Sequence, residues 1–454
     1  MFFIKFNWLK SNVLLCFVFL LFSVAVSAQQ SGTRIRNFDV QHYVIRTSFD
    51  RSAKTVFGET TVRLKPLTTT FDAFYLDAAG MQIESVSLET NGKPLKFAAD
   101  ANRLNITLDK SYSTNDEISV RVKYKIVKPK LGVYFVSGEV FGSYKRPAQI
   151  WTQGEPEENH YWFPGYDSPD DKATSEQYIT VNLDEKAIAN GKLLEVKKNG
   201  KTQTYHYKMD VPHSTYLVSF VIGKYKQVTE KYKNVPLGFY VYEGTDFIVP
   251  RAFGKTSTMM KTFGKLLNYE FPFEKYDQTV VGKFNFGGME NITATTLADT
   301  EIYAATNSKS RDAENLVSHE LAHSWFGNLV TCKNWSNLWL NEGFATFMES
   351  VFIENQYGRE EYLKEMKTNA NAYFGEESVG IRHPLQNPRA LPNILLFDST
   401  TYKKGAVVIN MLREQVGDEM FWKSINNYLN KHKYQNVESK DLQTAFEQTS
   451  GQNL

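Results

Sequence analysis

Cysteine is nearly absent from this chain of 454 residues, which contains only two. Cys16 lies in an apolar segment near the start, and Cys332 lies far along the chain. If the first segment is removed, Cys332 has no intramolecular partner, so the fold must depend on burial of its core rather than on disulfides. No motif around Cys332 would activate a thiolate, which favours a buried small residue over a nucleophile.

An excess of charge of one sign is also missing. The formal net charge is +2, from 52 Lys and Arg against 50 Asp and Glu. Lys5 and Lys10 belong to the first segment, and without them the two signs balance. We therefore expect neither nucleic acid nor an anionic membrane surface as a partner.

Long apolar runs are absent except at the start, where one spans residues 13–26. Lys5 and Lys10 precede it, and small residues ending in Ala28 follow, which is the order of a secretory signal peptide. A membrane anchor is the alternative, but the run is shorter than the roughly 20 residues that a spanning helix needs. We predict cleavage after Ala28 (signal peptide 1–28), export to the periplasm or the exterior, and no stable membrane insertion afterwards.

The segment 29–232 shows period-two alternation and no long helical period. In "TVFGETTVRLKPL" the alternate residues Val56, Thr60 and Val62 fall on one face. Asn91-Gly92 and Asn199-Gly200 each separate two alternating runs, which is a strong hairpin signal. These patterns predict one all-β domain.

From 233 to 454 the apolar residues recur at three- and four-residue spacing, which predicts a mainly helical second domain. Expected helices include 251–271, 311–326 with Ser310 as N-cap, and a third that ends at Gly358. The fold class is thus a multi-domain α+β chain, with the all-β domain first.

"HELAH", at 319–323, is the motif that indicates chemistry. Residues i and i+4 share one helix face, so His319 and His323 can bind one zinc ion together. Glu320 is offset by about 100° and can serve as a general base for an attacking water without ligating the metal. By itself the motif leaves open an ordinary buried helix whose histidines are satisfied by other partners.

A catalytic zinc needs a third protein ligand. Glu342, in "NLWLNEGFATF", lies on the next amphipathic helix among large apolar residues, where a carboxylate needs a partner. Two antiparallel helices would bring it against the histidine pair. Glu349, two turns further on, can orient one of the ligands or be a plain surface acid.

Together "HELAHSWFGNLV" and "LWLNEGFATF" resemble the gluzincin aminopeptidases, the family of aminopeptidase N and leukotriene hydrolase. The resemblance covers about residues 33–454 and implies an all-β domain followed by a thermolysin-like catalytic domain that ends at or near Leu454. It implies one Zn²⁺ per chain, held by His319, His323 and Glu342, with Glu320 activating water.

"FGGMENIT" resembles the exopeptidase motif of that family, with Gly288 where many members have alanine. The resemblance implies that Glu290 binds the free ammonium of the substrate, and that Gly287, Gly288, Met289 and Asn291 complete this substrate-binding motif. Glycines there would let backbone groups approach the substrate closely.

Two further segments complete the resemblance. "IWTQGEPEEN" is similar to the segment that supplies a second amine-binding group, which implies substrate-binding roles for Gln153 and Glu155. "TTYKKGAVV" is similar to the segment whose tyrosine donates to the oxyanion, which implies a catalytic role for Tyr402. Phe286 and Phe397 occupy positions similar to the family's side-chain pocket.

The predicted function is therefore that of a zinc aminopeptidase acting on peptides with a free N-terminus. A leukotriene-hydrolase-like epoxide hydrolase is one alternative, suggested by the Gly-Gly motif. A non-catalytic zinc- or peptide-binding relative is another, although such a protein would be expected to lose Glu320 or Tyr402, and both are present.

Overall fold

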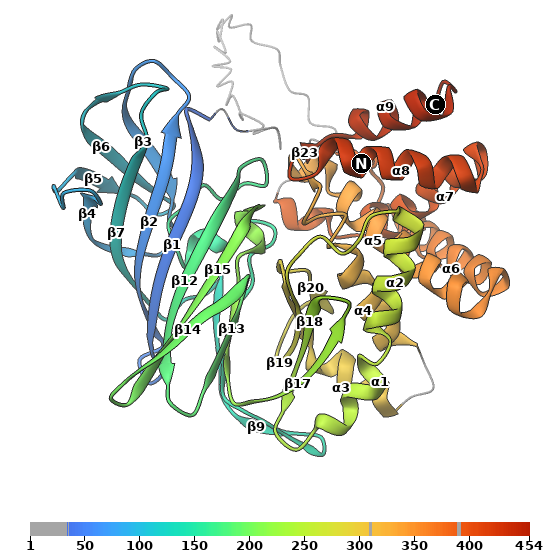
Figure 1. Ribbon diagram of the computed structural model, residues 1–454, viewed down its shortest axis with the longest axis horizontal. Coiled ribbons are helices and arrows are strands. Elements are labelled where there is room, and N and C mark those ends of the chain that lie inside the picture. The colour runs from blue at the N-terminus through green and yellow to red at the C-terminus, as the bar shows by residue number, and fades with distance from the viewer. Residues whose placement is uncertain (1–33, 35, 308–310, 388–391) are drawn as a thin grey trace, which may run out of the picture.

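A computed structural model describes residues 34, 36–307, 311–387 and 392–454 of the chain. The predicted signal peptide lies outside these residues, as does the expected N-cap Ser310. The described chain forms a β-rich first part and a mainly helical second part side by side (Figure 1). This arrangement confirms the predicted order of an all-β domain followed by a helical domain.

The β-rich part is built on a seven-stranded sheet in which β1 and β12 pair in parallel and all other neighbours are antiparallel. In sheet order its strands are β14 (Lys192–Asn199), β15 (Thr202–Ser214), β12 (Lys172–Asn182), β1 (Phe38–Asp50), β2 (Thr55–Pro66), β7 (Ile118–Val127) and β4 (Gln82–Leu88). Alternate residues of β2 such as Val56, Thr60 and Val62 are fully buried, as the period-two pattern predicts.

Smaller sheets pack around this one. They are β3 (Phe71–Asp77), β6 (Arg103–Tyr112) and β5 (Lys96–Ala99); β13 (Lys186–Ala189), β16 (Phe220–Gly223), β11 (Gln149–Thr152) and β8 (Val133–Val136); and β10 (Tyr144–Arg146) with β9 (Glu139–Phe141). The turn at Asn199-Gly200 joins β14 to β15 as a hairpin. The segments on either side of the Asn91-Gly92 turn pair only at an isolated bridge between Ser87 and Pro94, because β4 and β5 belong to different sheets.

The second part begins with a five-stranded sheet. Its strands, in sheet order, are β17 (Tyr225–Tyr232), β18 (Val235–Tyr242), β19 (Tyr276–Val281), β21 (Ala294–Ala298) and β20 (Gly288–Met289). The expected domain boundary between 232 and 233 falls inside the β17–β18 hairpin. The change of sheet comes at Lys224 instead, because strand alternation alone does not reveal which sheet a strand joins.

Helices cover this sheet and extend beyond it (Figure 1). They are α1 (Val249–Ala252), α2 (Thr256–Leu267), α3 (Asp299–Asn307), α4 (Asp312–Ala322), α5 (Trp339–Tyr357), α6 (Arg359–Ser378), α7 (Gly405–Val416), α8 (Asp418–His432) and α9 (Ser439–Ser450), with β22 (Thr331–Cys332) pairing β23 (Asn436–Val437). Of the 19 residues of α5, 14 are buried, which makes it the central helix. No helix in the described ranges is both long and apolar enough to cross a membrane.

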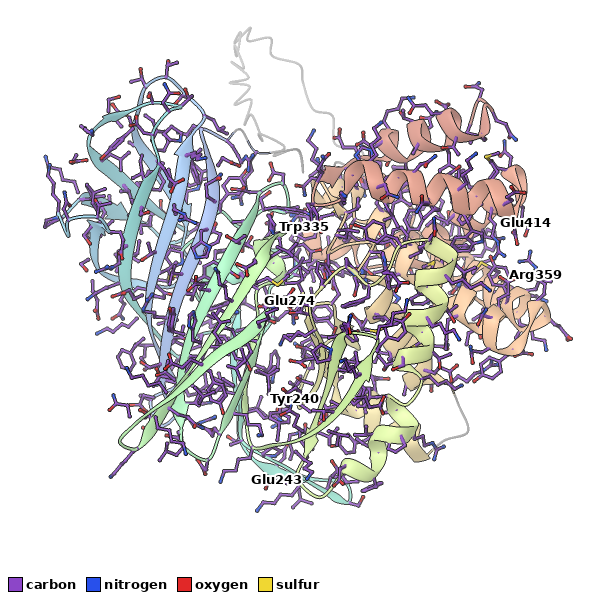
Figure 2. All side chains as sticks on the ribbon, viewed as in Figure 1. Tyr240, Glu243, Glu274, Trp335, Arg359 and Glu414 are labelled. Atoms are coloured by element: carbon purple, nitrogen blue, oxygen red, sulfur yellow. The ribbon has the colours of Figure 1, made fainter. Side chains whose placement is uncertain are left out.

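Buried and partly buried polar contacts join the two parts. Arg146 donates to both carboxylate oxygens of Asp299, at 2.7 and 3.0 Å, and both side chains are buried. Trp335 lies where the two parts meet (Figure 2). Its indole N–H donates to Glu157 at 3.1 Å. Lys172 of β12 donates to two backbone carbonyls of the loop after α4. Charge-assisted bonds of this kind specify one relative placement of the parts.

Candidate metal centre and active site

Helix α4 carries the two histidines of the motif on one face. The helix ends at Ala322, and His323 continues it for one residue, with φ −57° and ψ −21° and its N–H bonded to the His319 carbonyl at 3.3 Å. The two imidazoles are therefore one turn apart, and their Nε2 atoms lie 3.2 Å from each other.

Glu342, in the first turn of α5, closes the group. Its Oε2 lies 3.3 Å from His319 Nε2 and 3.4 Å from His323 Nε2, and only 2% of the residue is exposed. The first turn of a helix favours a carboxylate through the helix dipole. A tetrahedral zinc with bonds of about 2.0–2.1 Å to its ligands needs ligand atoms roughly 3.3 Å apart. The three residues thus fit a zinc ion.

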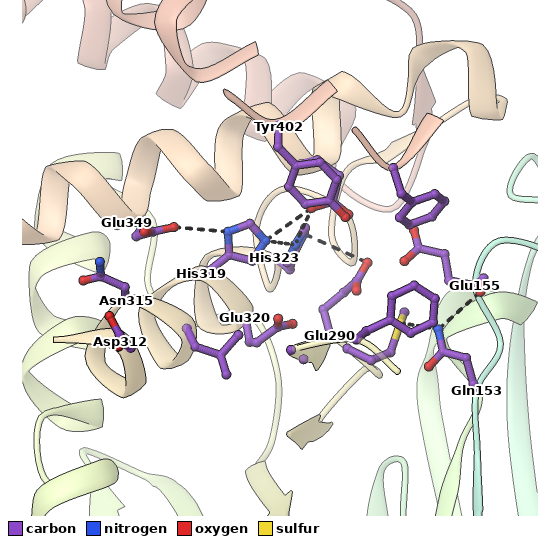
Figure 3. Close-up of a pocket in the computed structure, with 17 residues that line it drawn as sticks. Gln153, Glu155, Glu290, Asp312, Asn315, His319, Glu320, His323, Glu349 and Tyr402 are labelled. Atoms are coloured by element: carbon purple, nitrogen blue, oxygen red, sulfur yellow. Dashed lines mark hydrogen bonds and ion pairs between the residues drawn. The ribbon is translucent and has the colours of Figure 1, made fainter. Parts of the chain in front are cut away.

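The other ring nitrogen of each histidine is engaged outside the group, as Figure 3 shows for His319 and Glu349. His323 Nδ1 lies 2.9 Å from the Phe326 carbonyl, to which it donates, so Nε2 is the ring nitrogen available to bind a metal beside Glu342. His319 Nδ1 lies 3.6 Å from Glu349 Oε2. Such outer partners hold metal-binding imidazoles in orientation.

The charges of the group favour a cation at its centre. Burial opposes ionisation of Glu342, yet the neighbouring histidines lower its pKa to about 2. Burial likewise opposes the charged form of the histidines, but the surrounding carboxylates raise the pKa of His319 to about 9 and that of His323 to about 10. A divalent cation bound at this position would interact directly with the surrounding carboxylates.

Glu320 lies beside the ligand group without joining it. It is 5% exposed, and its Oε2 finds no hydrogen-bond partner among the described residues. Burial raises the pKa of Glu320 to about 8. A Cβ at Gly288 would fall 2.1 Å from Glu320 Oε1, so the glycine lets strand β20 pass against this carboxylate. An unpaired, buried carboxylate next to a metal site can accept a proton.

A second group of carboxylates adjoins the first. Oxygens of Glu155, Glu290 and Glu342 all lie within 4.8 Å of one another, and the three side chains are buried. Burial and then the neighbouring Glu290 raise the pKa of Glu155, and burial also raises that of Glu290. Within the described chain neither Oε1 of Glu155 nor Oε1 of Glu290 has a hydrogen-bond partner, and Glu290 Oε1 lies 4.0 Å from His323 Nδ1. Buried carboxylates need a cation, and an ammonium group would satisfy both.

Most of the remaining predicted substrate-binding residues border the same space. Gln153, Gly287, Gly288 and Met289 line the cavity, and Gln153 Nε2 lies 3.2 Å from the Glu155 carbonyl and 3.3 Å from Met289 Sδ. Asn291 is different. Its side chain donates to Thr296 Oγ1 at 3.1 Å and does not border the cavity, because the chain turns into β21 at this point. The structure thus does not place the Asn291 side chain on the cavity, and its predicted substrate contact stays a prediction.

Tyr402 stands on a π-helical turn, Thr400–Lys404, just before α7. Its ring lies nearly parallel to that of His319, with centroids 6.0 Å apart. The close approach between α5 and the start of α7, next to Tyr402, depends on two glycines. A Cβ on Gly343 or on Gly405 would come within 3.0 Å of the other residue's Cα. Burial raises the pKa of Tyr402, so its hydroxyl stays protonated and can donate a hydrogen bond.

These residues surround one cavity of about 360 Å³. Phe286, Phe397 and Glu349 also line it, as do three residues that the sequence reasoning did not identify, namely Asp312, Asn315 and Leu316. The signal was available: 312, 315, 316, 319 and 323 follow helical spacing, so they share the face that carries the histidines. The polar residues Asp312 and Asn315 extend the cavity toward the start of α4 (Figure 3).

Comparison with known families finds matches over most of the chain. The peptidase family M1 domain matches residues 251–454, and the peptidase M1 N-terminal domain matches residues 39–217. The gap between the two matches contains Lys224, where the structure changes from one sheet to the next.

Several curated proteins are similar in sequence. A leucyl aminopeptidase of Saccharolobus solfataricus is 30% identical over 387 residues, which cover 84% of this chain and 48% of that protein. Aminopeptidase N of Streptomyces lividans is 32% identical over 325 residues, covering 68% and 37%. The chain spans about half the length, or less, of the curated relatives it matches.

A solved structure shares the fold. An M1 zinc metallopeptidase mutant from Deinococcus radiodurans, bound to a Tyr-Ser-Ala substrate, superposes with a TM-score of 0.77 at 23% identity. The match covers 94% of this chain and 95% of that one. The order of β-rich and helical parts is therefore common to both proteins.

Proposed function

Because this chain belongs to peptidase family M1, as its matches to both domains of that family establish, we propose that it is a zinc-dependent aminopeptidase. The proposal rests on the observation that two groups of side chains lie next to each other in one cavity. The His319, His323 and Glu342 group fits a zinc ion, and the buried carboxylates of Glu155 and Glu290 adjoin it, with no hydrogen bond to Oε1 of either within the described chain. A metal site that can activate water, next to carboxylates that can bind a free ammonium, is suited to cleaving the first residue from the N-terminus of a peptide.

Glu155 and Glu290 bind the α-ammonium of the peptide and so limit how far its chain enters the cavity. Strand β20 is at the edge of its sheet, where an extended substrate can add as a further strand. The first side chain then faces Phe286 and Phe397, whose rings lie 6.2 Å apart, which favours an apolar first residue. The substrate class is thus peptides with a free N-terminus.

Two side chains, Glu320 and Tyr402, carry out the proton transfer and the hydrogen bonding that hydrolysis of the peptide bond requires. When bound, zinc would polarise the scissile carbonyl and make water more acidic. Glu320 takes the proton from the attacking water and passes it to the leaving amine. The Tyr402 hydroxyl donates toward the oxyanion as the carbonyl becomes tetrahedral.

The activity is tested with aminoacyl anilides and their N-acetylated counterparts. The free-amine anilides are expected to be cleaved, a chelator is expected to stop cleavage, and added Zn²⁺ to restore it. Acetylation removes the ammonium and is expected to lower kcat/KM by about 10–100-fold, the range that one charge-assisted hydrogen bond represents. Zinc-loaded protein that shows no chelator-sensitive release from any anilide would exclude the proposal.

Export is proposed on the strength of the segment 1–28, which has the charge and apolar order of a signal peptide. The full chain expressed in a bacterial host is expected to appear outside the cytoplasm with Gln29 as its first residue, as read by N-terminal sequencing. Ala28→Arg, which removes the small residue at the cleavage site, is expected to leave the leader attached. Recovery of the unmodified chain with an intact leader in the membrane fraction would contradict cleavage.

A further inference from the structure

The two carboxylates that face a substrate amine come from different parts of the fold. Glu155 follows β11 in the β-rich part, and Glu290 follows β20 in the second part. Their oxygens nevertheless lie within 4.8 Å of each other. Their separation therefore depends on how firmly the two parts are held together near this point, since neither loop carries both residues.

Asn190, directly after β13, bonds to both sides of that junction. Its Nδ2 donates to the Ile292 carbonyl at 2.7 Å and to the Leu217 carbonyl at 3.1 Å. Its Oδ1 accepts from the Ser219 N–H at 2.7 Å. The side chain is almost completely buried, with 1% of the residue exposed. A carboxamide used in this way has no rotational freedom left, and any substitution leaves a buried carbonyl unpaired.

The two carbonyls that Asn190 binds each belong to a segment next to one of the two carboxylates. Ile292 is two residues after Glu290, and its own N–H donates to the Leu217 carbonyl at 3.3 Å. On the other side, the segment ending at Leu217 packs against Gly154, where a Cβ would lie 2.2 Å from the Tyr216 carbonyl oxygen. Gly154 adjoins Glu155. Asn190 thus connects the backbone next to one carboxylate with the backbone that supports the other.

A neighbouring bond reinforces the same connection. The N–H of Gly191 donates to Thr293 Oγ1 at 2.8 Å, one residue beyond Ile292. Thr293 has a φ of 61°, a conformation that β-branched residues rarely adopt, so contacts from outside the turn must hold it. The turn after Glu290 therefore depends on the β-rich part for its conformation.

We propose that Asn190 is a positioning residue of the amine-binding site, which sets the separation of Glu155 and Glu290 without touching substrate. The inference rests on the proposed aminopeptidase function and adds to it a residue of the β-rich part that governs selection of a free α-amine. Loss of the Asn190 carboxamide leaves zinc binding intact and weakens the preference for an amine.

The test measures binding to the zinc-loaded full chain by calorimetry, with two hydroxamates that differ in one group. Leucine hydroxamate carries the α-amine, and 4-methylpentanoyl hydroxamate lacks it. Wild type is expected to bind the first more tightly. In Asn190→Ala the ratio of the two affinities is expected to fall roughly tenfold, as for loss of one hydrogen bond, with binding of the amine-free compound unchanged.

Gln203→Ala is the matched control. Gln203 is also a buried amide, and its Nε2 donates to the Leu183 and Glu185 carbonyls at 3.1 and 2.8 Å, but within the β-rich part alone. Its affinity ratio is expected to equal that of wild type. An unchanged ratio in Asn190→Ala, an equal weakening of both compounds, or the same fall in Gln203→Ala would each overturn the proposal.

A second variant tests the proposal in case Asn190→Ala does not fold. Thr293→Ala removes the acceptor of the Gly191 N–H and is expected to lower the same ratio, whereas Thr293→Ser, which keeps the hydroxyl, restores it. An unchanged ratio in Thr293→Ala would overturn the inference alone. A wild-type protein that does not prefer the amine would overturn the proposed aminopeptidase function together with this inference.

Discussion

Glu320→Gln is expected to lower kcat by about 10²–10⁴-fold, the contribution of a positioned general base, with zinc content unchanged. Glutamine keeps the size of the side chain but cannot take a proton from water. Glu320 does not belong to the group whose atoms lie 3.2–3.4 Å apart, so its loss leaves the ligands in place. Hydrolysis of an aminoacyl anilide and metal analysis on the same sample measure both quantities.

The control for this variant lies on the same helix. Glu314→Gln alters an acid in the first turn of α4, which pairs with Lys255 at 2.6 Å and does not line the cavity. Its kcat is expected to match that of wild type. A Glu320→Gln protein that retains full activity would exclude the assigned base, and one that loses its zinc would show that Glu320 supports the metal.

Glu342→Ala is expected to abolish stable zinc binding, and activity with it. Two imidazoles alone cannot complete a three-ligand site, and the carboxylate that faces both Nε2 atoms is removed. Because a ligand that binds the native state raises the melting temperature, wild type is expected to melt higher with zinc than without it, and Glu342→Ala equally in both. Calorimetric melting with and without Zn²⁺, and zinc content after dialysis, measure the effect.

Glu349→Ala provides a graded comparison on the same helix. Glu349 contacts the far nitrogen of His319, so its removal is expected to weaken zinc affinity by about 10–100-fold rather than abolish it. If Glu342→Ala bound zinc like wild type and Glu349→Ala did not, Glu342 would not be a ligand and the site would have to be redrawn.

Local spacing accounts for what could be predicted of the metal centre. A helix places residues i and i+4 on one face, so His319 and His323 had to point the same way once α4 formed. The apolar surroundings of Glu342 required a partner for its carboxylate, and the structure brings its Oε2 to both imidazoles. The order of an all-β part and a helical part likewise followed from the period of the apolar residues.

Contacts between distant segments could not be predicted in this way. Asn291 belongs to the same short motif as Glu290, yet its side chain turns away toward Thr296 because the next strand joins a sheet there. Strand β17 alternates like the strands before it but pairs with β18 in the second sheet. Neither the Asn291–Thr296 contact nor the β17–β18 pairing can be recognised from the local sequence.

The sequence by itself determined the zinc-binding pattern, the glutamate beside it and the succession of strands and helices, because each depends on the geometry of a single element. Only the tertiary structure decided that Glu155 meets Glu290, that Gly343 and Gly405 let Tyr402 approach His319, and that Asn190 bonds to the backbone segments beside these two carboxylates. These contacts join residues that are far apart in the chain. They arise from the packing of whole elements, which no periodicity within one element encodes.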